Sequence, residues 1–253
     1  MRQSIAHTDN RKNGLIRILE QYGQVRVKML ADELDVSPLT IRRDLDYLQE
    51  QGLVKRSYGK ATLLNPVSNA FSSTQIRCKN AIAKAAAQLV QDQDTILINT
   101  SSTALLVLKY LSAKNVTIVT NNGKVMNMDL EHQPYVILTG GELRFPKESM
   151  VGDITLDNLR RVYANIAFIG CSGLSTENGV STAVMAEGSV NRMMMERAEK
   201  VVIVADHTKI GSDSNFPYVG LEAVDHLITD ASAKRSVLNA IRKLDIEITI
   251  ADK

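Results

Sequence analysis

From Thr95 onward the chain alternates short apolar runs with longer amphipathic segments, and this alternation limits the fold more than any other feature. The apolar runs have the length of strands that a parallel sheet buries on both faces. We expect strands at 95–98, 116–120, 135–138, 166–169, 201–205, 226–228 and 246–250. We expect helices at 82–90, 102–111, 156–161, 186–198 and 233–244. Strands that alternate with helices predict a Rossmann-like, mainly parallel α/β domain.

Small polar residues follow the first expected strand, where α/β sheets bind their ligands. These residues precede an expected helix, whose N–H groups and dipole favour a phosphate. They are Asn99, Thr100, Ser101, Ser102 and Thr103. Such a cluster is most often a plain helix cap.

Other loops at strand ends add residues that can hold a polar ligand. Glycines permit close backbone approach, carboxylates accept hydrogen bonds, and an ammonium group pairs with an anion. The candidates are Asn121, Gly140, Gly141, Glu187, Asp206 and Lys209, with Glu187 opening a helix after a loop at 179–182. Paired glycines are commonly a turn, and Asp206 with Lys209 can be a local ion pair. Their shared position at strand ends favours a ligand site.

The N-terminal part has the order of a helix-turn-helix domain. Apolar residues at 14–21 predict a first helix, which Gly23 ends as a C-cap glycine. A second helix is expected at 27–34, and a tight turn at 35–37 leads to a third. The helix-turn-helix itself is expected at about 25–44, with the last helix reading DNA.

The third helix carries groups that suit a major groove. Ser37 is its expected N-cap, and Pro38 fits the first position because it needs no hydrogen bond there. Apolar residues at helical spacing face a core and leave a hydroxyl, a methyl and two guanidinium groups outside. The outward residues are Ser37, Leu39, Thr40, Arg42 and Arg43. Two adjacent arginines can also mark a plain solvated surface, but the turn, the cap and the basic hairpin that follows favour recognition.

A β-hairpin is expected at 53–63 as the wing of this domain. Its basic residues can reach the DNA backbone beside the groove. The candidate contacts are Lys55, Arg56, Tyr58 and Lys60.

Charge is unevenly distributed, although the net charge is only +2. Residues 1–63 hold 11 Lys and Arg against 8 Asp and Glu, and the remainder holds 19 against 20. Because DNA affinity rises with the phosphates neutralised, this modest excess favours a homodimer or homotetramer that multiplies the contacts. The absence of Trp and the few aromatic residues disfavour stacking on single-stranded nucleic acid.

Cys78 and Cys171 are the two cysteines, and their spacing fits no metal or redox motif. His132, His207 and His226 also lack metal-ligand spacing, so we expect neither a metal nor a cofactor. No apolar run approaches the ~18 residues of a membrane span, and the N-terminus lacks a signal-peptide apolar region. The expected location is the cytoplasm, without a membrane partner.

A polar stretch separates the two parts. Asn65, Pro66 and the residues around them break any element, and Ser72 to Thr74 continue the break. We expect a DNA-binding domain at 8–63, a linker at 64–80 and an α/β effector-binding domain at 81–253.

The N-terminal motifs resemble the winged helix of the DeoR family of bacterial transcription regulators. The resemblance lies in VSPLTIRRDLDYLQEQGLVKRSYGKA at 36–61 and is most specific in TIRRDL at 40–45. The family's wing usually reads His-Gly-Gly-Ala, whereas this chain has Tyr58-Gly59-Lys60-Ala61. Gly59 keeps the bend, and Lys60 adds a charge.

The second part resembles the effector domain of the same family, which is similar to ribose-5-phosphate isomerases and glucosamine-6-phosphate deaminases. The motifs are Val119-Thr120-Asn121, 138–142, Phe168-Ile169-Gly170, 179–182, 205–209 and Ile228-Thr229-Asp230. The resemblance implies a phosphorylated sugar as effector, with its phosphate at 99–103 and near Lys209.

The chain departs from the family pattern at several positions. The phosphate loop usually reads Asp-Ser-Gly-Thr-Thr, but here an amide replaces the carboxylate at Asn99 and Ser101 replaces the glycine. Asn165 stands where an aspartate is common, and His207 where a serine is usual. These departures predict an unusual effector or weakened phosphate binding.

These features predict a sequence-specific DNA-binding repressor of sugar transport and catabolism genes, with operator DNA and a phosphorylated sugar as partners. The alternative is a sugar-phosphate isomerase or deaminase that carries an accessory DNA-binding domain. This enzyme requires a general base, for which Asp206, Glu187 and Glu142 are candidates. The amides at Asn99 and Asn165, where an acid would help, count against it.

Overall fold

The computed structural model describes residues 11–12, 14–16, 18–19, 24–50, 53–63, 73–131, 134–145 and 147–252. The chain forms two compact units, residues 1–76 and 77–253. Gly23, His132, residues 8–10 and residues 64–72 of the expected linker lie outside the described residues.

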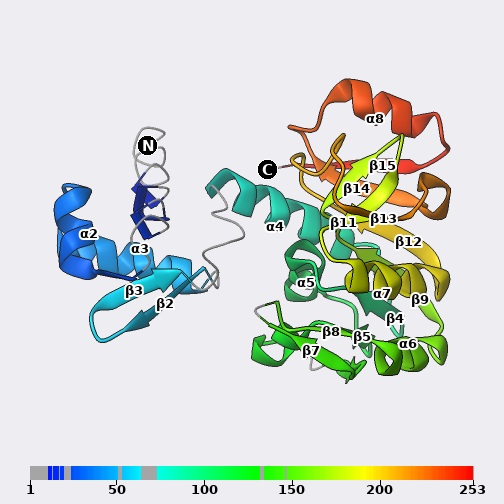
Figure 1. The fold of residues 1–253 in the computed structure, drawn as a ribbon, viewed down its shortest axis with the longest axis horizontal. Helices are drawn as coiled ribbons and strands as arrows, with labels where there is room; N and C mark the ends of the chain where they lie inside the picture. Colours follow the sequence, from blue (N-terminus) through cyan, green and yellow to red (C-terminus); the bar gives the residue numbers. More distant parts are fainter. Residues whose placement is uncertain are drawn as a thin grey trace. The chain divides into compact units, whose positions relative to one another are not determined.

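The N-terminal unit combines helices with a three-stranded antiparallel sheet (Figure 1). Its named elements are β1 (Gln24–Arg26), α2 (Val27–Glu33), α3 (Pro38–Glu50), β2 (Val54–Ser57) and β3 (Lys60–Leu63). Residues 14–16 and 18–19 are helical, as expected for a first helix. The apolar residues expected to face a core do so, and the buried set includes Leu15, Leu19, Leu30, Ile41, Leu45 and Leu48. The order of the strands is β1-β3-β2, and β1 is an addition to the expected hairpin.

The second unit is built on a seven-stranded parallel sheet. Its strands in spatial order are β15 (Glu247–Ala251), β14 (His226–Asp230), β12 (Ala198–Val204), β9 (Ala164–Ile169), β4 (Thr95–Ile98), β5 (Thr117–Thr120) and β6 (Tyr135–Leu138). From the centre, β4 to β6 extend to one edge and β9 to β15 to the other. The expected Rossmann-like fold is confirmed, and its strand order reverses at the carboxyl ends of β4 and β9.

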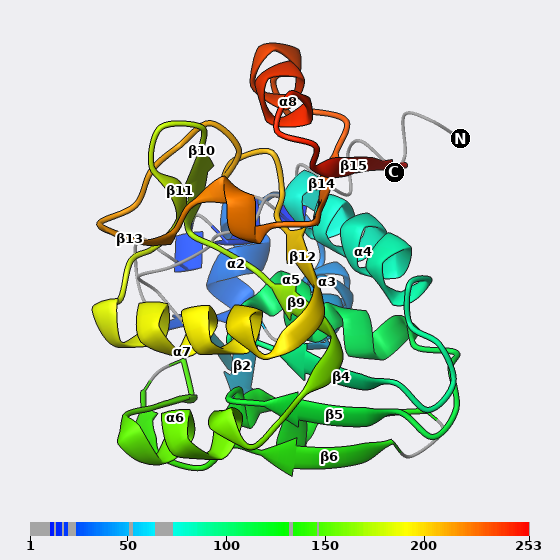
Figure 2. The same cartoon turned by 90° about the vertical axis from the view of Figure 1, so that its right-hand side faces the viewer.

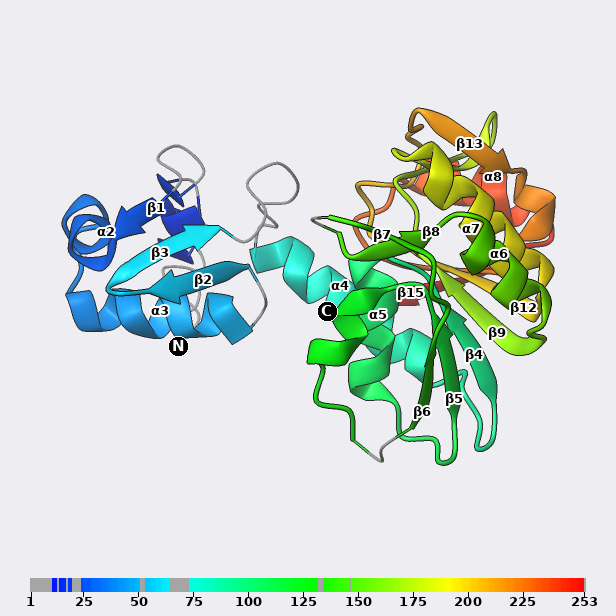
Figure 3. The ribbon, with the colours of Figure 1, turned by 60° about the horizontal axis from the view of Figure 1, so that its bottom comes forward.

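Helices cover both faces of this sheet (Figures 2 and 3). One face carries α4 (Ser73–Ala87), α5 (Ser102–Val107) and a 3₁₀ turn at Leu108–Tyr110. The other carries α6 (Asp153–Arg160), α7 (Met185–Glu196) and α8 (Arg235–Arg242). Because successive strand residues point to opposite faces, Ile96 and Ile98 share a core with Ile82 of α4, whereas Leu97 shares one with Val190 of α7.

In the described part of the second unit, five short strands lie outside the main sheet. A hairpin pairs β7 (Glu142–Arg144) with β8 (Ser149–Val151), and a small sheet contains β10 (Gly173–Ser175), β11 (Gly179–Thr182) and β13 (Phe216–Val219). Short 3₁₀ turns also occur at Gly123–Asn127 and Leu221–Ala223. The prediction of a loop at 179–182 is therefore wrong, because these residues form β11. This strand is buried along its whole length, so it lacks the alternating pattern that would reveal it.

The helix α4 begins at Ser73, earlier than expected. Residues 73–80, which we expected to belong to the linker, are helical. The hydroxyl residues at this start favour caps and turns when judged locally. Burial of Ile76 and Cys78 on the helix outweighs that local preference, because tertiary packing supplies most of the stability of a helix.

Among the described residues, no helix combines the length and the apolar character that a bilayer requires.

Candidate functional site

The N-terminal half of α3 presents the expected DNA-reading residues. Ser37 Oγ accepts a hydrogen bond from Thr40 N at 3.1 Å and lies 2.9 Å from Thr40 Oγ1, so Ser37 caps the helix as expected. Leu39 is 57% exposed, and both Arg42 and Arg43 are exposed. An apolar group beside two guanidiniums suits a thymine methyl, guanine edges and phosphates.

A sharp turn brings α3 into this position. Asp35 adopts a left-handed conformation with φ of 50°, which Asp tolerates better than most residues. Val36 N then donates to Ala31 O at 3.0 Å, which ties the turn to α2.

Ion pairs hold α3 against its neighbours. Buried Asp44 accepts from Arg11 Nε at 2.6 Å and from Arg11 Nη2 at 3.1 Å. The hydrogen bond to Asp44 raises the pKa of Arg11, so this guanidinium stays charged. Among the described residues, no ion pair involves Arg42 or Arg43, and both side chains are exposed.

The expected wing is formed by β2 and β3. Its turn consists of Tyr58 and Gly59 with φ of 48° and 74°, and two successive positive φ values define a type I′ hairpin. The Tyr58 side chain is fully exposed at the tip. Lys55 and Lys60 lie on the outer face of the sheet, since Val54 and Ala61 beside them are buried on the inner face.

Arg56 differs from the other basic residues of the wing. It lies on the inner face and forms an ion pair with Asp46 of α3. The expected approach of Arg56 to the DNA backbone therefore competes with an existing partner. Alternation along the strand separates Arg56 from Lys55, a distinction that a list of basic residues does not reveal.

Arg26 was not selected from the sequence, yet it joins this outer face. It pairs in register with Lys60, and both flank the buried pair of Val25 and Ala61. Arg26 lies on β1, which has only three residues and is therefore too short to give a recognisable alternating pattern. The strand is identified by its pairing with β3.

In the second unit, Asn99 joins the ends of β4 and β9. Its Nδ2 donates to Gly170 O at 2.9 Å and to Asn191 Oδ1 at 3.1 Å, and its Oδ1 accepts from Gly170 N at 3.0 Å. Asn99 is buried, whereas the adjacent Thr100 is half-buried. The Asn99 amide therefore links the loops after β4 and β9, at the switch point where the strand order of the sheet reverses. This role needs both a hydrogen-bond donor and an acceptor, and a carboxylate has no donor.

Ser101 is the N-cap of α5. Its Oγ accepts from Thr103 N at 3.2 Å and from Ala104 N at 3.4 Å, so the cap takes N–H groups that we expected to hold a phosphate. A Cβ added at Gly170 would lie 1.9 Å from Ser101 Oγ, which shows how closely the two loops touch. Ser102, next in the chain, is exposed.

Lys79 lies beside this loop, although the local sequence predicts a linker at this position. Its side chain is buried, and its Nζ donates to Ser102 Oγ at 3.0 Å. Burial lowers the pKa of Lys79 to about 7, while the charge of Asp206 raises it and that of Lys209 lowers it. If the sequence had predicted a helix that begins at Ser73, Lys79 would have been recognised as a buried residue. Lys79 lies on the same buried face of α4 as Ile76 and Ala83.

The loop after β12 supplies Asp206 and Lys209 to the same region. Asp206 is buried and accepts from Thr208 N at 3.0 Å and Thr208 Oγ1 at 2.5 Å. The structure thus brings three expected residues, Ser102, Asp206 and Lys209, around Lys79. We call these four residues the lysine cluster.

Asn121 lies at the end of β5, beside Ser149 of β8. Asn121 Nδ2 donates to Met150 O at 2.9 Å. Among the described residues, the buried Asn121 Oδ1 and Ser149 Oγ have no hydrogen-bond partner. An unsatisfied buried polar atom costs about 1–3 kcal/mol, so both atoms are suited to bind a polar ligand.

Gly140 and Gly141 form a turn after β6 and have φ of 67° and 112°. A Cβ at Gly141 would lie 2.1 Å from Thr155 Oγ1 and 2.6 Å from Val151 O. The groups that pack closely against Gly141 therefore belong to α6 and the end of β8. We expected a ligand to occupy this space instead.

Glu187 lies within the first turn of α7 and is buried. Its carboxylate pairs with Lys147 Nζ at 3.1 Å. Asn191 lies one helical turn later and contacts Asn99. Glu187 is thereby placed near the switch point on the buried side of α7.

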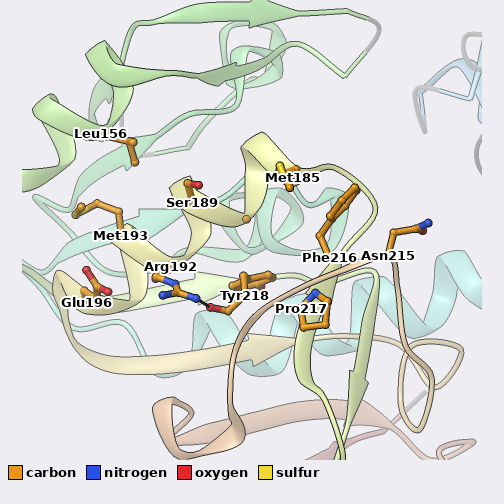
Figure 4. A pocket seen from close by; sticks show the side chains of 11 residues that line it. Leu156, Met185, Ser189, Arg192, Met193, Glu196, Asn215, Phe216, Pro217 and Tyr218 are labelled. Atoms are coloured by element: carbon orange, nitrogen blue, oxygen red, sulfur yellow. Dashed lines mark hydrogen bonds between the residues drawn. The ribbon is translucent and has the colours of Figure 1, made fainter.

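The opposite side of α7 borders a hollow of about 450 Å³ (Figure 4). Its lining is largely apolar and includes Met185, Met193, Phe216 and Pro217. Arg192 points toward it but donates to Tyr218 O. None of the residues expected to bind the effector lines this hollow, and its apolar walls suit a phosphate poorly.

Comparisons with known proteins agree on both units. Residues 74–231 match the family model of the DeoR C-terminal sensor domain, and residues 11–67 match the DeoR-like helix-turn-helix domain. The HTH-type transcriptional regulator GolR of Listeria innocua is 32% identical, with 96% of this chain and 98% of that protein covered. The glycerol-3-phosphate regulon repressor of Escherichia coli is 31% identical, over 95% of this chain and 98% of that protein.

Among solved structures, the full-length sorbitol operon regulator SorC of Klebsiella pneumoniae is similar at 12% identity and a TM-score of 0.40. The match covers 86% of this chain and 94% of that chain.

Proposed function

This chain belongs to the DeoR family of DNA-binding transcriptional regulators, and we propose that it represses sugar transport and catabolism genes under the control of a phosphorylated sugar. The proposal includes binding to double-stranded operator DNA as a homodimer or homotetramer, which presents paired copies of α3 to two half-sites.

The observation that carries the proposal is the exposed pair Arg42 and Arg43 on a helix that a cap and ion pairs hold in place. Bidentate arginine contacts to guanine are the commonest way to read sequence in the major groove. The outer face of the wing, with Lys55 and Lys60, adds contacts to the backbone that do not depend on sequence.

We place the effector at the carboxyl ends of β4 and β9, next to the lysine cluster. Lys209 supplies positive charge for a phosphate, Lys79 supplies a buried amine whose lowered pKa a bound anion would raise, and Ser102 supplies a hydroxyl. Asn121 Oδ1 and Ser149 Oγ are suited to sugar hydroxyl groups. In this proposal the lysine cluster binds the phosphate, and Asn121 with Ser149 binds the sugar hydroxyl groups.

The proposed role is regulation without catalysis. Of the three candidate bases, Asp206 accepts hydrogen bonds from Thr208, Glu187 is paired with Lys147, and Glu142 is exposed on β7. An isomerase needs a carboxylate within reach of a sugar carbon, whereas the carboxylates of Asp206 and Glu187 already contact other groups of the chain. An aldose–ketose interconversion assay on the purified chain should show no turnover.

The test is a binding titration of the full chain with its own promoter DNA, followed by addition of a panel of phosphorylated sugars. We expect one sugar phosphate to weaken DNA binding by about 5–150-fold, the usual range of allosteric coupling. Tight, sequence-independent binding to DNA would contradict the recognition role. An inert panel of sugar phosphates would contradict the effector assignment.

A further inference from the structure

Three potential metal ligands converge beside the carboxyl ends of β12 and β14. They are Cys78 of α4, His207 of the loop after β12, and Asp230, the last residue of β14. One ligand atom from each residue lies within 4.8 Å of the other two. No sequence motif links these residues, because the three lie on separate elements that only the folded sheet brings together.

Burial makes this cluster different from a chance group on the surface. Cys78 and the Asp230 carboxylate are fully buried, whereas the side chain of His207 is 30% exposed. The group therefore has a protein-lined interior and one side open to solvent. A metal site needs both, a dry cavity for its ligands and a path of entry.

Hydrogen bonds already orient the carboxylate. Asp230 accepts from His207 N at 2.8 Å and from Ser232 N at 3.0 Å. His207 Nδ1 lies 3.0 Å from both carboxylate oxygens. Each carboxylate oxygen has a second lone pair, so the backbone donors can fix Asp230 while it binds a cation. Such outer contacts commonly support metal ligands.

We infer that Cys78, His207 and Asp230 form a binding site for a divalent transition-metal ion of the zinc type. A thiolate, an imidazole and a carboxylate are all zinc ligands, and three protein ligands leave a fourth position for water. The thiolate selects against magnesium and calcium, which prefer oxygen. The thiol gives up its proton as the metal binds, whereas a neutral imidazole binds through its unprotonated nitrogen, so binding releases the thiol proton and acidifies a weakly buffered solution.

Cobalt(II) added to the full-length, tag-free protein, after treatment with a chelator, tests this site. A thiolate–cobalt bond gives a charge-transfer band in the near ultraviolet, and a tetrahedral site gives strong visible bands. We expect both, with one cobalt bound per chain and displaced by zinc. Absence of the charge-transfer band would overturn the proposal.

Two variants and a matched control assign the ligands. Cys78→Ser should abolish the charge-transfer band. Cys171→Ser, which removes the other thiol of the chain, should leave the band intact. His207→Gln, at a partly exposed position, should weaken cobalt binding more than the ~100-fold typical of losing an outer-shell contact. A band that survives Cys78→Ser but disappears with Cys171→Ser would also refute the assignment.

Thermal unfolding gives a second readout that does not depend on any variant. A ligand that binds only the folded state raises its stability. Zinc should therefore raise the melting temperature of the full chain, while magnesium should not. Equal shifts with the two ions would contradict a site that contains a thiolate.

Discussion

The helix α3, which we propose reads DNA, and the lysine cluster are assembled in opposite ways. In α3, Ser37 caps a residue only three positions later, and the reading side chains follow at once. In the second unit, Lys79 contacts Ser102 across 23 positions, and Asn99 contacts Gly170 across 71. A function carried by one helix can be inferred from local spacing, whereas a function shared by several loops depends on the sheet that aligns them.

The sharpest test of the proposed DNA contact of α3 is the double variant Arg42→Ala with Arg43→Ala. Each bidentate arginine contributes about 1–3 kcal/mol to DNA binding. The double variant should therefore lose at least ~30-fold in affinity for the operator, measured by fluorescence anisotropy at fixed salt. Arg56→Ala is the control: because Arg56 is paired with Asp46, its loss should have a much smaller effect. Equal losses would contradict the assignment of α3 as the reading helix.

The close packing of the second unit can be tested at its paired glycines. Gly141→Ala should lower the free energy of unfolding by roughly 2–4 kcal/mol, because its Cβ clashes with Thr155 and its φ is unfavourable for alanine. Gly140→Ala has the same kind of φ, but its Cβ would make only ordinary van der Waals contacts at 3.9 and 4.0 Å, so only about 1–2 kcal/mol should be lost. Denaturant titration measures both. A larger loss at Gly140 would show that φ, and not packing, sets the requirement for glycine.

The proposed role of the lysine cluster in effector binding can be tested at Lys79. Lys79→Met keeps the buried stem but removes the ammonium group, and a hydrogen bond to a charged group contributes about 1.5–3 kcal/mol. The effector that releases the wild-type protein from DNA should therefore be needed at a concentration at least ~10-fold higher. Affinity for DNA without effector should stay unchanged. Lys84→Met, at an exposed position of the same helix, is the matched control and should respond like wild type.

The smallest expected effect concerns the cap of α3. Ser37→Ala removes the acceptor for Thr40 N and should lower the stability of the N-terminal unit by about 1 kcal/mol. Ser37→Asp, which keeps a good cap, should restore stability. Because it adds a negative charge near phosphates, it should still weaken DNA binding, which separates the capping role from the DNA contact. Thermal unfolding and anisotropy on the same samples give the two readouts.

Much of the N-terminal unit could be predicted because its signals are local. The cap at Ser37, the core spacing of Ile41, Leu45 and Leu48, and the exposed arginines all follow from helical periodicity. The partner of Arg56 could not be predicted, because the pairing of β2 with β3 decides which face of the wing Arg56 occupies.

Hydrophobic periodicity within short segments was sufficient to predict the α/β class, the parallel strands and the helix-turn-helix. The burial of Lys79 beside Ser102, the hydrogen bonds of Asn99 between the ends of β4 and β9, and the close packing of Gly141 against Thr155 emerge only in the folded chain. These contacts are set by the order of strands in the sheet. Strand order depends on packing between distant segments, and a local pattern contains no information about it.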